Sequence, residues 1–393
     1  MKRLLVILVM ASTLVASVSA APHPPLTQHG GKWLEGHVQG IAVDVNGGFI
    51  YYSFTTLLAK YDFSGKLVGT LENLPVHLGD LDFNPRDGCI YGSFEYLKDH
   101  AYYVTMIDGR KINRVGIDAA RTDIIRTVYL EEILKDYLVD MDRDGKITLD
   151  YGQNRNREAQ GRDHRYGVAG FDGVGFGPEF GRTDGTYYLT VAYGNYNNLD
   201  RDDCDHQVLL QYDVRDWVQY ARPFTEAAPH RSGPPAPKGK YFLRTGQTNW
   251  GVQNLSYDSY TKRWFLGVYQ GKRPGFPNYT LFNVDARKPP VPGDLIGVPA
   301  PGPEAHGWEQ GLLLSFADDG LKDEATGIRG WMQKADVGTQ PIGGGLFYLA
   351  LDSSGKDADG KRWQSADLTL MRWTGEAQKP FVPATNDDVK KLK

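Results

Sequence analysis

The chain has 393 residues, with 48 acidic against 44 basic side chains and a formal net charge of −4. This length is enough for one large domain or two ordinary ones. Because the two kinds of charge nearly balance, the chain has no global positive field to attract a phosphate backbone, and we expect no nucleic-acid partner. The 46 glycines, 23 tyrosines and 8 tryptophans fit a turn-rich, all-β protein.

The first residues have the composition of a secretory signal peptide. Two basic side chains precede an apolar stretch over 4–15, and small residues continue to Ala21. We expect cleavage after Ala20 or Ala21, so that residues 1–21 are removed from a secreted protein, either extracellular or periplasmic. An uncleaved membrane anchor is the alternative. No later apolar run is long enough to span a membrane.

The rest of the chain repeats one strand pattern five times. Each unit has a first strand that ends on a tight turn, a second strand rich in aromatic residues, and a third strand that ends near an Asp. The second strands are expected at 49–54, 89–94, 187–192, 263–268 and 346–351, and the third strands at 58–62, 103–108, 208–213, 280–285 and 368–373. Such units cannot bury their apolar faces alone and must stack on their neighbours. The pattern therefore predicts a single β-propeller of five four-stranded blades.

The propeller is expected to cover 22–385, and the Lys- and Asp-rich residues 386–393 to form a flexible tail. The five blades are expected to begin at residues 38, 77, 170, 250 and 306. A small helical and loop insertion over about 114–165 follows blade two; a sixth blade, there or within 317–345, is the alternative. Export would permit a disulfide between Cys89 and Cys204, but their expected positions lie too far apart to be bridged.

Within the insertion, apolar spacing over 128–139 predicts a helix that runs into an acidic loop over 140–151. The loop has Asp at positions one, three and five, Gly at six and Ile at eight, and it resembles the EF-hand calcium loop. Tyr151 stands where that family has a bidentate Glu. The resemblance implies a structural Ca²⁺ with ligands from Asp140, Asp142, Asp144, Lys146 and Asp150. A solvated Asp-rich turn is the alternative.

Polar side chains gather where the innermost strands of the blades are expected to begin. Aligning these strands on their first apolar residue places Gln39, Asp172, Gln253 and Gln310 at one height. Histidines precede the first, second and fifth strands. We expect a polar funnel on the axis whose candidate catalytic residues are His37, His77, Asp80, Asp172 and Glu309. The candidate substrate-binding residues are Gln39, Glu95, Tyr193, Asn249, Gln253, Lys272, His306, Trp308 and Gln310.

Two family resemblances bear on this funnel. The run Glu35-Gly36-His37 resembles the first blade of the gluconolactonase and senescence-marker group, which has Glu-Gly-Pro there; this implies Glu35 as a ligand of a divalent metal on the axis. The count of five blades resembles five-bladed glycosidases such as arabinanases. That resemblance implies acid and base roles for axial carboxyl groups, with Asp80, Asp172, Glu95 and Glu309 as the matching residues.

Carboxylates, imidazoles, carboxamides and aromatic rings around one concavity suit a glycan or another small polar substrate. We therefore expect a secreted carbohydrate-active enzyme, either a polysaccharide lyase or a glycoside hydrolase. Three clustered histidines and Lys272 favour an anionic sugar and the lyase, whereas the carboxylates favour the hydrolase. The alternatives are a non-catalytic binding or scaffold propeller and a metal-dependent, lactonase-like hydrolase, because a fold does not by itself imply an activity.

Overall fold

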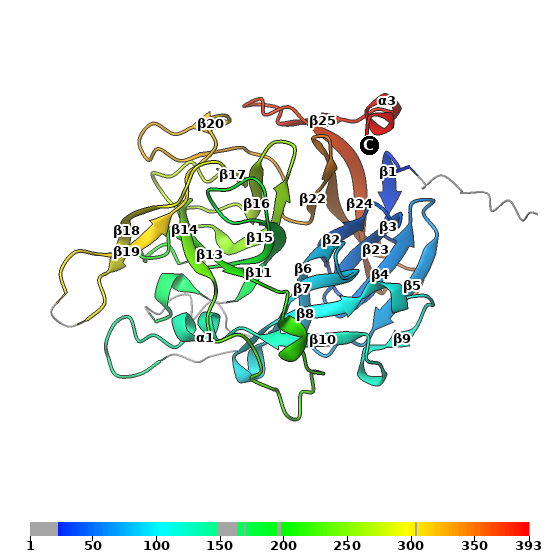
Figure 1. The fold of residues 1–393 in the computed structure, drawn as a ribbon, viewed down its shortest axis with the longest axis horizontal. Helices are drawn as coiled ribbons and strands as arrows, with labels where there is room; N and C mark the ends of the chain where they lie inside the picture. Colours follow the sequence, from blue (N-terminus) through cyan, green and yellow to red (C-terminus); the bar gives the residue numbers. More distant parts are fainter. Residues whose placement is uncertain (1–22, 148–162, 169, 195–197, 303–304, 393) are drawn as a thin grey trace, which may run out of the picture.

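The computed structural model describes residues 23–147, 163–168, 170–194, 198–302 and 305–392. The predicted signal peptide lies outside these residues. Strands dominate, and they form the predicted five-bladed β-propeller (Figure 1). No described helix is long and apolar enough to cross a membrane. Neither Cys89 nor Cys204 forms a disulfide.

Five inner strands surround the axis, and each packs against the next until the ring closes. They are β2 (Val38–Asp44), β6 (His77–Asn84), β11 (Phe171–Pro178), β15 (Asn249–Asp258) and β22 (Thr339–Gly343). Contacts between β2 and β22 complete the ring. The described strands form no sixth blade.

Blades one and two are built from consecutive antiparallel strands, as the repeats predict. Blade one continues with β3 (Phe49–Phe54), β4 (Leu57–Asp62) and β5 (Leu67–Glu72), and blade two with β7 (Cys89–Tyr96), β8 (Ala101–Asp108) and β10 (Ile125–Tyr129). The segment expected to be an insertion supplies β10, and it also supplies β9 (Ile117–Asp118), which pairs in parallel with β5. It therefore completes one blade and extends another before it reaches helix α1 (Glu131–Tyr137).

Blade three has six strands rather than four. After β11 come β12 (Tyr187–Tyr193), β13 (His206–Tyr212), β14 (Gly239–Arg244), β19 (Trp308–Leu313) and β18 (Val291–Pro299). Blade four has only β15, β16 (Arg263–Tyr269) and β17 (Leu281–Asp285). Single bridges from β17 to Phe316 and Trp331 take the place of its fourth strand. A small ribbon of β20 (Leu321–Lys322) and β21 (Arg329–Gly330) lies between these bridges in the sequence.

The predicted first strand of blade five, near residue 308, is wrong. That segment is β19, which pairs in parallel with β14 at the outside of blade three. The inner strand of blade five is β22, and β23 (Leu346–Lys356) and β24 (Arg362–Trp373) follow it as predicted. Both β19 and β22 are short and mix polar residues, a glycine and apolar residues, so local sequence does not distinguish the outer strand from the inner one.

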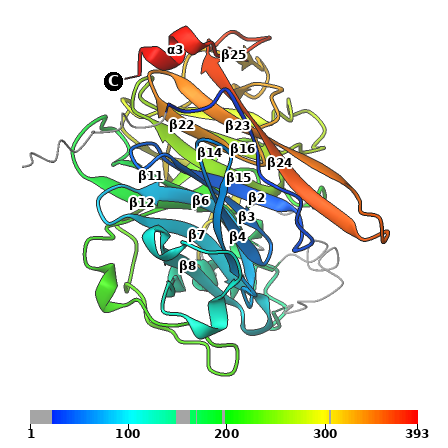
Figure 2. The same ribbon diagram turned by 90° about the vertical axis from the view of Figure 1, so that its right-hand side faces the viewer.

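Both ends of the described chain join blade five. Strand β1 (Thr27–His29) pairs with the outer edge of β24, and β25 (Phe381–Pro383) pairs further along the same edge. The predicted flexible tail is instead helix α3 (Asn386–Lys390), next to β25 (Figure 2). Thr385 and Asp388 form a capping box at its start, and Val389 is buried, which explains why this end is ordered.

Candidate functional site

β-Bulges interrupt four of the five inner strands at the same end of the propeller. In β2, β11 and β15 the extra residue is Gln39, Asp172 and Gln253, respectively, and in β6 the register shifts around Gly79 and Asp80. A bulge re-aims a side chain that a regular strand would send elsewhere. When the predicted inner strands were aligned with one another on their first apolar residue, these positions fell at the same height along the axis. The incorrectly predicted fifth strand is the exception.

The bulges border a cavity of about 470 Å³ at this end of the axis. Seven of its lining residues were predicted from the sequence: His37, Gln39, His77, Glu95, Asp172, Asn249 and Gln253. They come from blades one to four, so the cavity is an asymmetric site and not a five-fold ring. Two imidazoles, two carboxyl groups and three carboxamides make it strongly polar.

The Asp172 carboxylate occupies the middle of this polar set. Its Oδ1 lies 3.9 Å from Nδ1 of His77, and its Oδ2 accepts a hydrogen bond of 3.1 Å from Nε2 of Gln253. The side chains of His77 and Asp172 are 26% and 19% exposed, so both remain accessible from the cavity. Across the cavity, Nε2 of Gln39 lies 2.9 Å from Nε2 of His37. The carboxylate is thus held between an imidazole and a carboxamide.

Glu95 reaches the same cavity from β7, where it pairs with His77 on β6. Its Oε1 accepts a hydrogen bond from the amide of Phe171, in blade three. Gly170 makes this approach possible, because a Cβ at that position would lie 2.2 Å from Oε1 of Glu95. Two carboxyl groups, from blades two and three, are therefore fixed in one concavity.

Asp80 was predicted to be catalytic, but the structure gives it a different role. It is 3% exposed, and its Oδ2 accepts hydrogen bonds from the amides of Val174 (2.9 Å) and Leu255 (2.8 Å). Its Oδ1 accepts one from Nδ2 of Asn254 at 2.9 Å. Burial raises the pKa of Asp80 well above its usual value, although these hydrogen bonds oppose the shift. Asp80 joins the inner strands of blades two, three and four and does not line the cavity.

Asp82, two residues further along β6, has a similar structural role. Its Oδ2 accepts a hydrogen bond of 2.7 Å from the amide of Phe176 in blade three, and its Oδ1 accepts one of 3.0 Å from Nε2 of Gln340 in blade five. Burial raises the pKa of Asp82 to about 6. The two acids together connect β6 to the inner strands of blades three, four and five.

Two other predicted substrate-binding residues also lie outside the cavity. Tyr193 is 1% exposed, and its hydroxyl donates to Asp136 of helix α1, which also accepts a hydrogen bond of 2.6 Å from Nζ of Lys240. Tyr193 therefore anchors the helix to blade three. Lys272 is exposed in the loop after β16 and does not line the cavity.

The residues predicted for a fifth inner strand are displaced with β19. His306 and Trp308 are exposed, and Gln310 donates to Asp294 of β18. Glu309 accepts a hydrogen bond of 2.7 Å from the hydroxyl of Tyr166. None of the four lines the axial cavity, so the predicted cluster of three histidines is reduced to His37 and His77.

The sequence analysis did not assign Trp250 to the site, although it lines the cavity together with Tyr269. Trp250 belongs to a second bulge of β15, where it and Gly251 have φ of 69° and 77°. Tyr269 ends β16 and pairs with Asn249. Burial, assisted by Asp336 and Asp172, raises the pKa of its hydroxyl. The only local signal for this bulge is the Trp-Gly dipeptide at the start of the strand.

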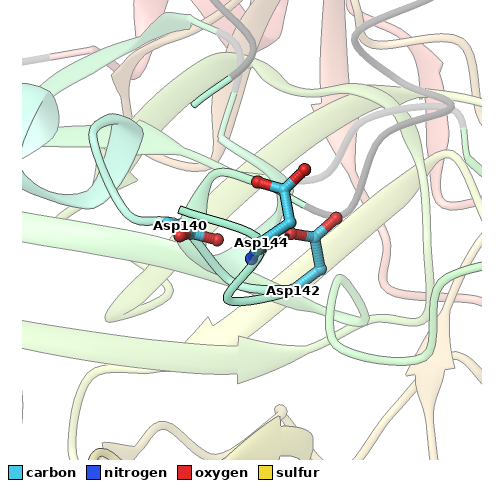
Figure 3. Close-up of side chains that lie close together, drawn as sticks. All are labelled: Asp140, Asp142 and Asp144. Carbon is cyan, nitrogen blue, oxygen red and sulfur yellow. Dashed lines mark hydrogen bonds between the residues drawn. The ribbon is translucent and has the colours of Figure 1, made fainter. Parts of the chain in front are cut away.

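A separate acidic cluster lies in the loop after α1 (Figure 3). One carboxylate oxygen from each of Asp140, Asp142 and Asp144 lies within 4.8 Å of the others. The amide of Gly145 donates to Asp140 at 2.9 Å, and that of Lys146 donates to Asp144 at 2.8 Å. The predicted ligand Asp150 lies outside the described residues. Within the described ranges no other group of three His, Cys, Asp or Glu side chains is as closely spaced, on the axis or elsewhere.

The chain matches no family model, and no curated protein matches it. Among solved structures it is similar to one described as the structure of the Dos1 propeller. The two share 11% sequence identity with a TM-score of 0.30, over 88% of this chain and 80% of that one. The five-bladed fold follows from the strand pairing described above.

Proposed function

We propose that the axial cavity binds a neutral saccharide and hydrolyses a glycosidic bond in it. The observation that carries this proposal is the meeting of His77, Glu95 and Asp172, from blades two and three, in one polar concavity. Glycoside hydrolysis uses a pair of carboxyl groups on either side of the scissile bond. Here Glu95 and Asp172 supply that pair, and His77 beside Asp172 can carry a proton in the same step.

The lining favours a neutral sugar over a uronate. No lysine or arginine is found among the described residues that line the cavity, so among them only the imidazoles of His37 and His77 could pair with a carboxylate on the sugar. Three carboxamides offer donors and acceptors to hydroxyl groups, and Trp250 and Tyr269 offer ring faces to C–H groups. Lys272 and His306, which would have favoured an anionic sugar and a lyase, lie elsewhere. These observations favour the hydrolase over the lyase.

A screen of neutral and uronate-containing oligosaccharides, with products identified by mass spectrometry, tests the proposal. We expect cleavage of a neutral substrate by addition of water. Asp172→Asn should lower kcat by about 10²- to 10⁴-fold while the protein still binds the saccharide in calorimetry. The exposed Asp184→Asn serves as the control. Cleavage of uronates only, with unsaturated products, would show a lyase; binding with no turnover would show a binding propeller.

We also propose that the loop at 140–151 binds Ca²⁺ and stabilises the segment after α1. Three closely spaced carboxylates on a tightly turned backbone support this, because Ca²⁺ prefers hard oxygen ligands. Titration calorimetry with CaCl₂ on chelator-treated protein should show one site that Asp142→Asn weakens. If Ca²⁺ neither binds nor raises the melting temperature, the loop is a solvated turn. No step at the axial cavity depends on this ion.

Export is the remaining part of the proposal, and it rests on the sequence pattern of residues 1–21. Expression of the full chain, fractionation of the cells and N-terminal sequencing of the recovered protein test it. We expect a mature chain that begins at Ala21 or Pro22 outside the cytoplasm. A full-length chain retained in the cytoplasm or the membrane would contradict it.

A further inference from the structure

We propose that the second bulge of β15, at residues 249–252, is a sugar-stacking subsite in which Trp250 is the platform. We further infer that Gln253 is the positioning residue that links this platform to Asp172. The inference rests on the proposed function and deepens it. It assigns the ligand a contiguous C–H face, as in a neutral pyranose, and it separates the groups that bind the sugar from those that orient the carboxylate.

The backbone at Trp250 is held in a conformation that a bulky residue rarely adopts. Its φ is 69°, and the next residue, Gly251, also has a positive φ of 77°. The register of β15 with β16 passes from the pair Asn249–Tyr269 directly to the pair Val252–Val268 and skips these two residues. A left-handed conformation is unfavourable for any residue with a Cβ, and it persists where the surrounding structure enforces it, often at ligand sites. Here the bulge places Trp250 in the wall of the axial cavity.

Gln253 joins this strained segment to the candidate catalytic carboxylate. Its side chain is 4% exposed, and Nε2 donates both to the carbonyl of Trp250 and to Oδ2 of Asp172, each at 3.1 Å. One amide group therefore uses its two N–H donors to fix the carboxylate relative to the platform. The orientation of Asp172 thus depends on the backbone of the bulge, whereas stacking depends on the indole ring.

The same bulge offers a hydrogen-bond acceptor. Oδ1 of Asn249 is buried and has no hydrogen-bond partner among the described residues, although Asn249 lines the cavity. Buried polar atoms without partners are uncommon, and each one requires an explanation. A hydroxyl group of a sugar ring stacked on Trp250 would donate a hydrogen bond to this oxygen. Tyr269, which pairs with Asn249 on β16, provides a second ring in the same wall.

Variants at two residues separate the two roles. Trp250→Gly removes the ring but keeps the bulge, because Gly adopts positive φ freely. We expect it to raise Kd and KM by about 10- to 100-fold, and Trp250→Phe, which keeps a ring, to raise Kd by less than about tenfold. Gln253→Leu removes the link to Asp172; we expect kcat to fall by about 10- to 100-fold and the pH–rate profile to shift, with Kd changed by less than about threefold. Lys272→Ala, at an exposed residue outside the cavity, is the matched control, and it should leave Kd, KM and kcat unchanged.

Binding is measured by calorimetry and tryptophan fluorescence with cellotetraose, xylotetraose and galactotetraose, so that the readout does not require turnover. Melting temperatures check folding: Trp250→Gly should melt above Trp250→Ala, because only Ala retains the unfavourable backbone conformation. If wild type binds none of the three probes, the proposed function fails, and this inference fails with it. If wild type binds a probe and Trp250→Gly binds it equally well, only the stacking inference is overturned. An unchanged kcat in Gln253→Leu would overturn the positioning role.

Discussion

Replacement of Asp80 tests whether a buried carboxylate at the centre of the propeller holds the blades together. Its two oxygens accept hydrogen bonds from the amides of Val174 and Leu255 and from the side chain of Asn254. All three partners are donors, so the site is built for an acceptor-only group, which an ionised carboxylate is. Burial opposes this, because it raises the pKa of Asp80 and disfavours the charged carboxylate.

The expected loss of stability follows from the groups that lose their acceptor. Asp80→Ala leaves two backbone N–H groups and one carboxamide in a buried site, and each unsatisfied group costs about 1–3 kcal/mol. Removal of a buried charge offsets part of this loss. We therefore expect Asp80→Ala to lower the free energy of unfolding by about 4 kcal/mol. Asp80→Asn keeps one acceptor oxygen and should lower it by about 2 kcal/mol.

Guanidinium denaturation followed by tryptophan fluorescence measures these differences, with the exposed Asp184→Asn as a control expected within about 0.5 kcal/mol of wild type. Hydrogen exchange with mass spectrometry adds a local measurement, because peptides that contain Val174 or Leu255 should exchange faster in Asp80→Ala. An Asp80→Asn variant more stable than wild type would refute the reasoning. It would show that the burial of charge outweighs the three hydrogen bonds.

Three further predictions concern other parts of the fold. Burial lowers the pKa of His164 to about 4. Between about pH 6.5 and pH 4 the imidazole therefore binds a proton in the unfolded chain but not in the folded protein. Because of this difference, the folded state loses stability as the pH falls through this range. His164→Gln should therefore reduce the loss of unfolding free energy between pH 7 and pH 4 by about 3 kcal/mol, and an unchanged difference would contradict this. The side chain of Arg201 is 2% exposed and pairs with Asp203 at 2.8 Å. Arg201→Ala should lower the free energy of unfolding by about 3–5 kcal/mol, because the carboxylate of Asp203 would remain buried without its partner. A loss below about 1 kcal/mol in denaturation would show that water replaces the guanidinium. Deletion of β1 removes the strand that joins the start of the described chain to blade five, and we expect the melting temperature to fall by more than about 5 °C; an unchanged value would show that β24 needs no partner there.

The sequence predicted the repeated unit well because that unit is local. A second strand such as β7 is a short run rich in aromatic residues, and a third strand such as β8 ends at an Asp before a turn, so they were placed within a few residues of their observed bounds. The polar positions Gln39, Asp172 and Gln253 were found by the same alignment, because the repeat places equivalent residues at equivalent heights. Most of the cavity could therefore be predicted.

Non-local pairing could not be predicted in this way. Strand β19 pairs with β14, which lies more than sixty residues earlier in the sequence, and no local pattern distinguishes this outer strand from the inner strand β22. For that reason His306 and Glu309 were assigned to the funnel. Asp80 was assigned to catalysis because an acid at the start of an inner strand can point into the cavity or toward neighbouring backbone amides.

What the sequence by itself determined is the number of blades, the second and third strand of each blade, and the polar residues of blades one to four that line the cavity. Only the tertiary structure decided which polar groups face the cavity and which hold the blades together. The physical reason is that both features depend on residues distant in the sequence. A bulge forms where two strands pair and changes the direction of a side chain. A buried acid accepts its hydrogen bonds from donors on neighbouring blades. Trp250 shows this most clearly, because it lines the cavity from a bulge with positive φ that interrupts the pairing of β15 with β16.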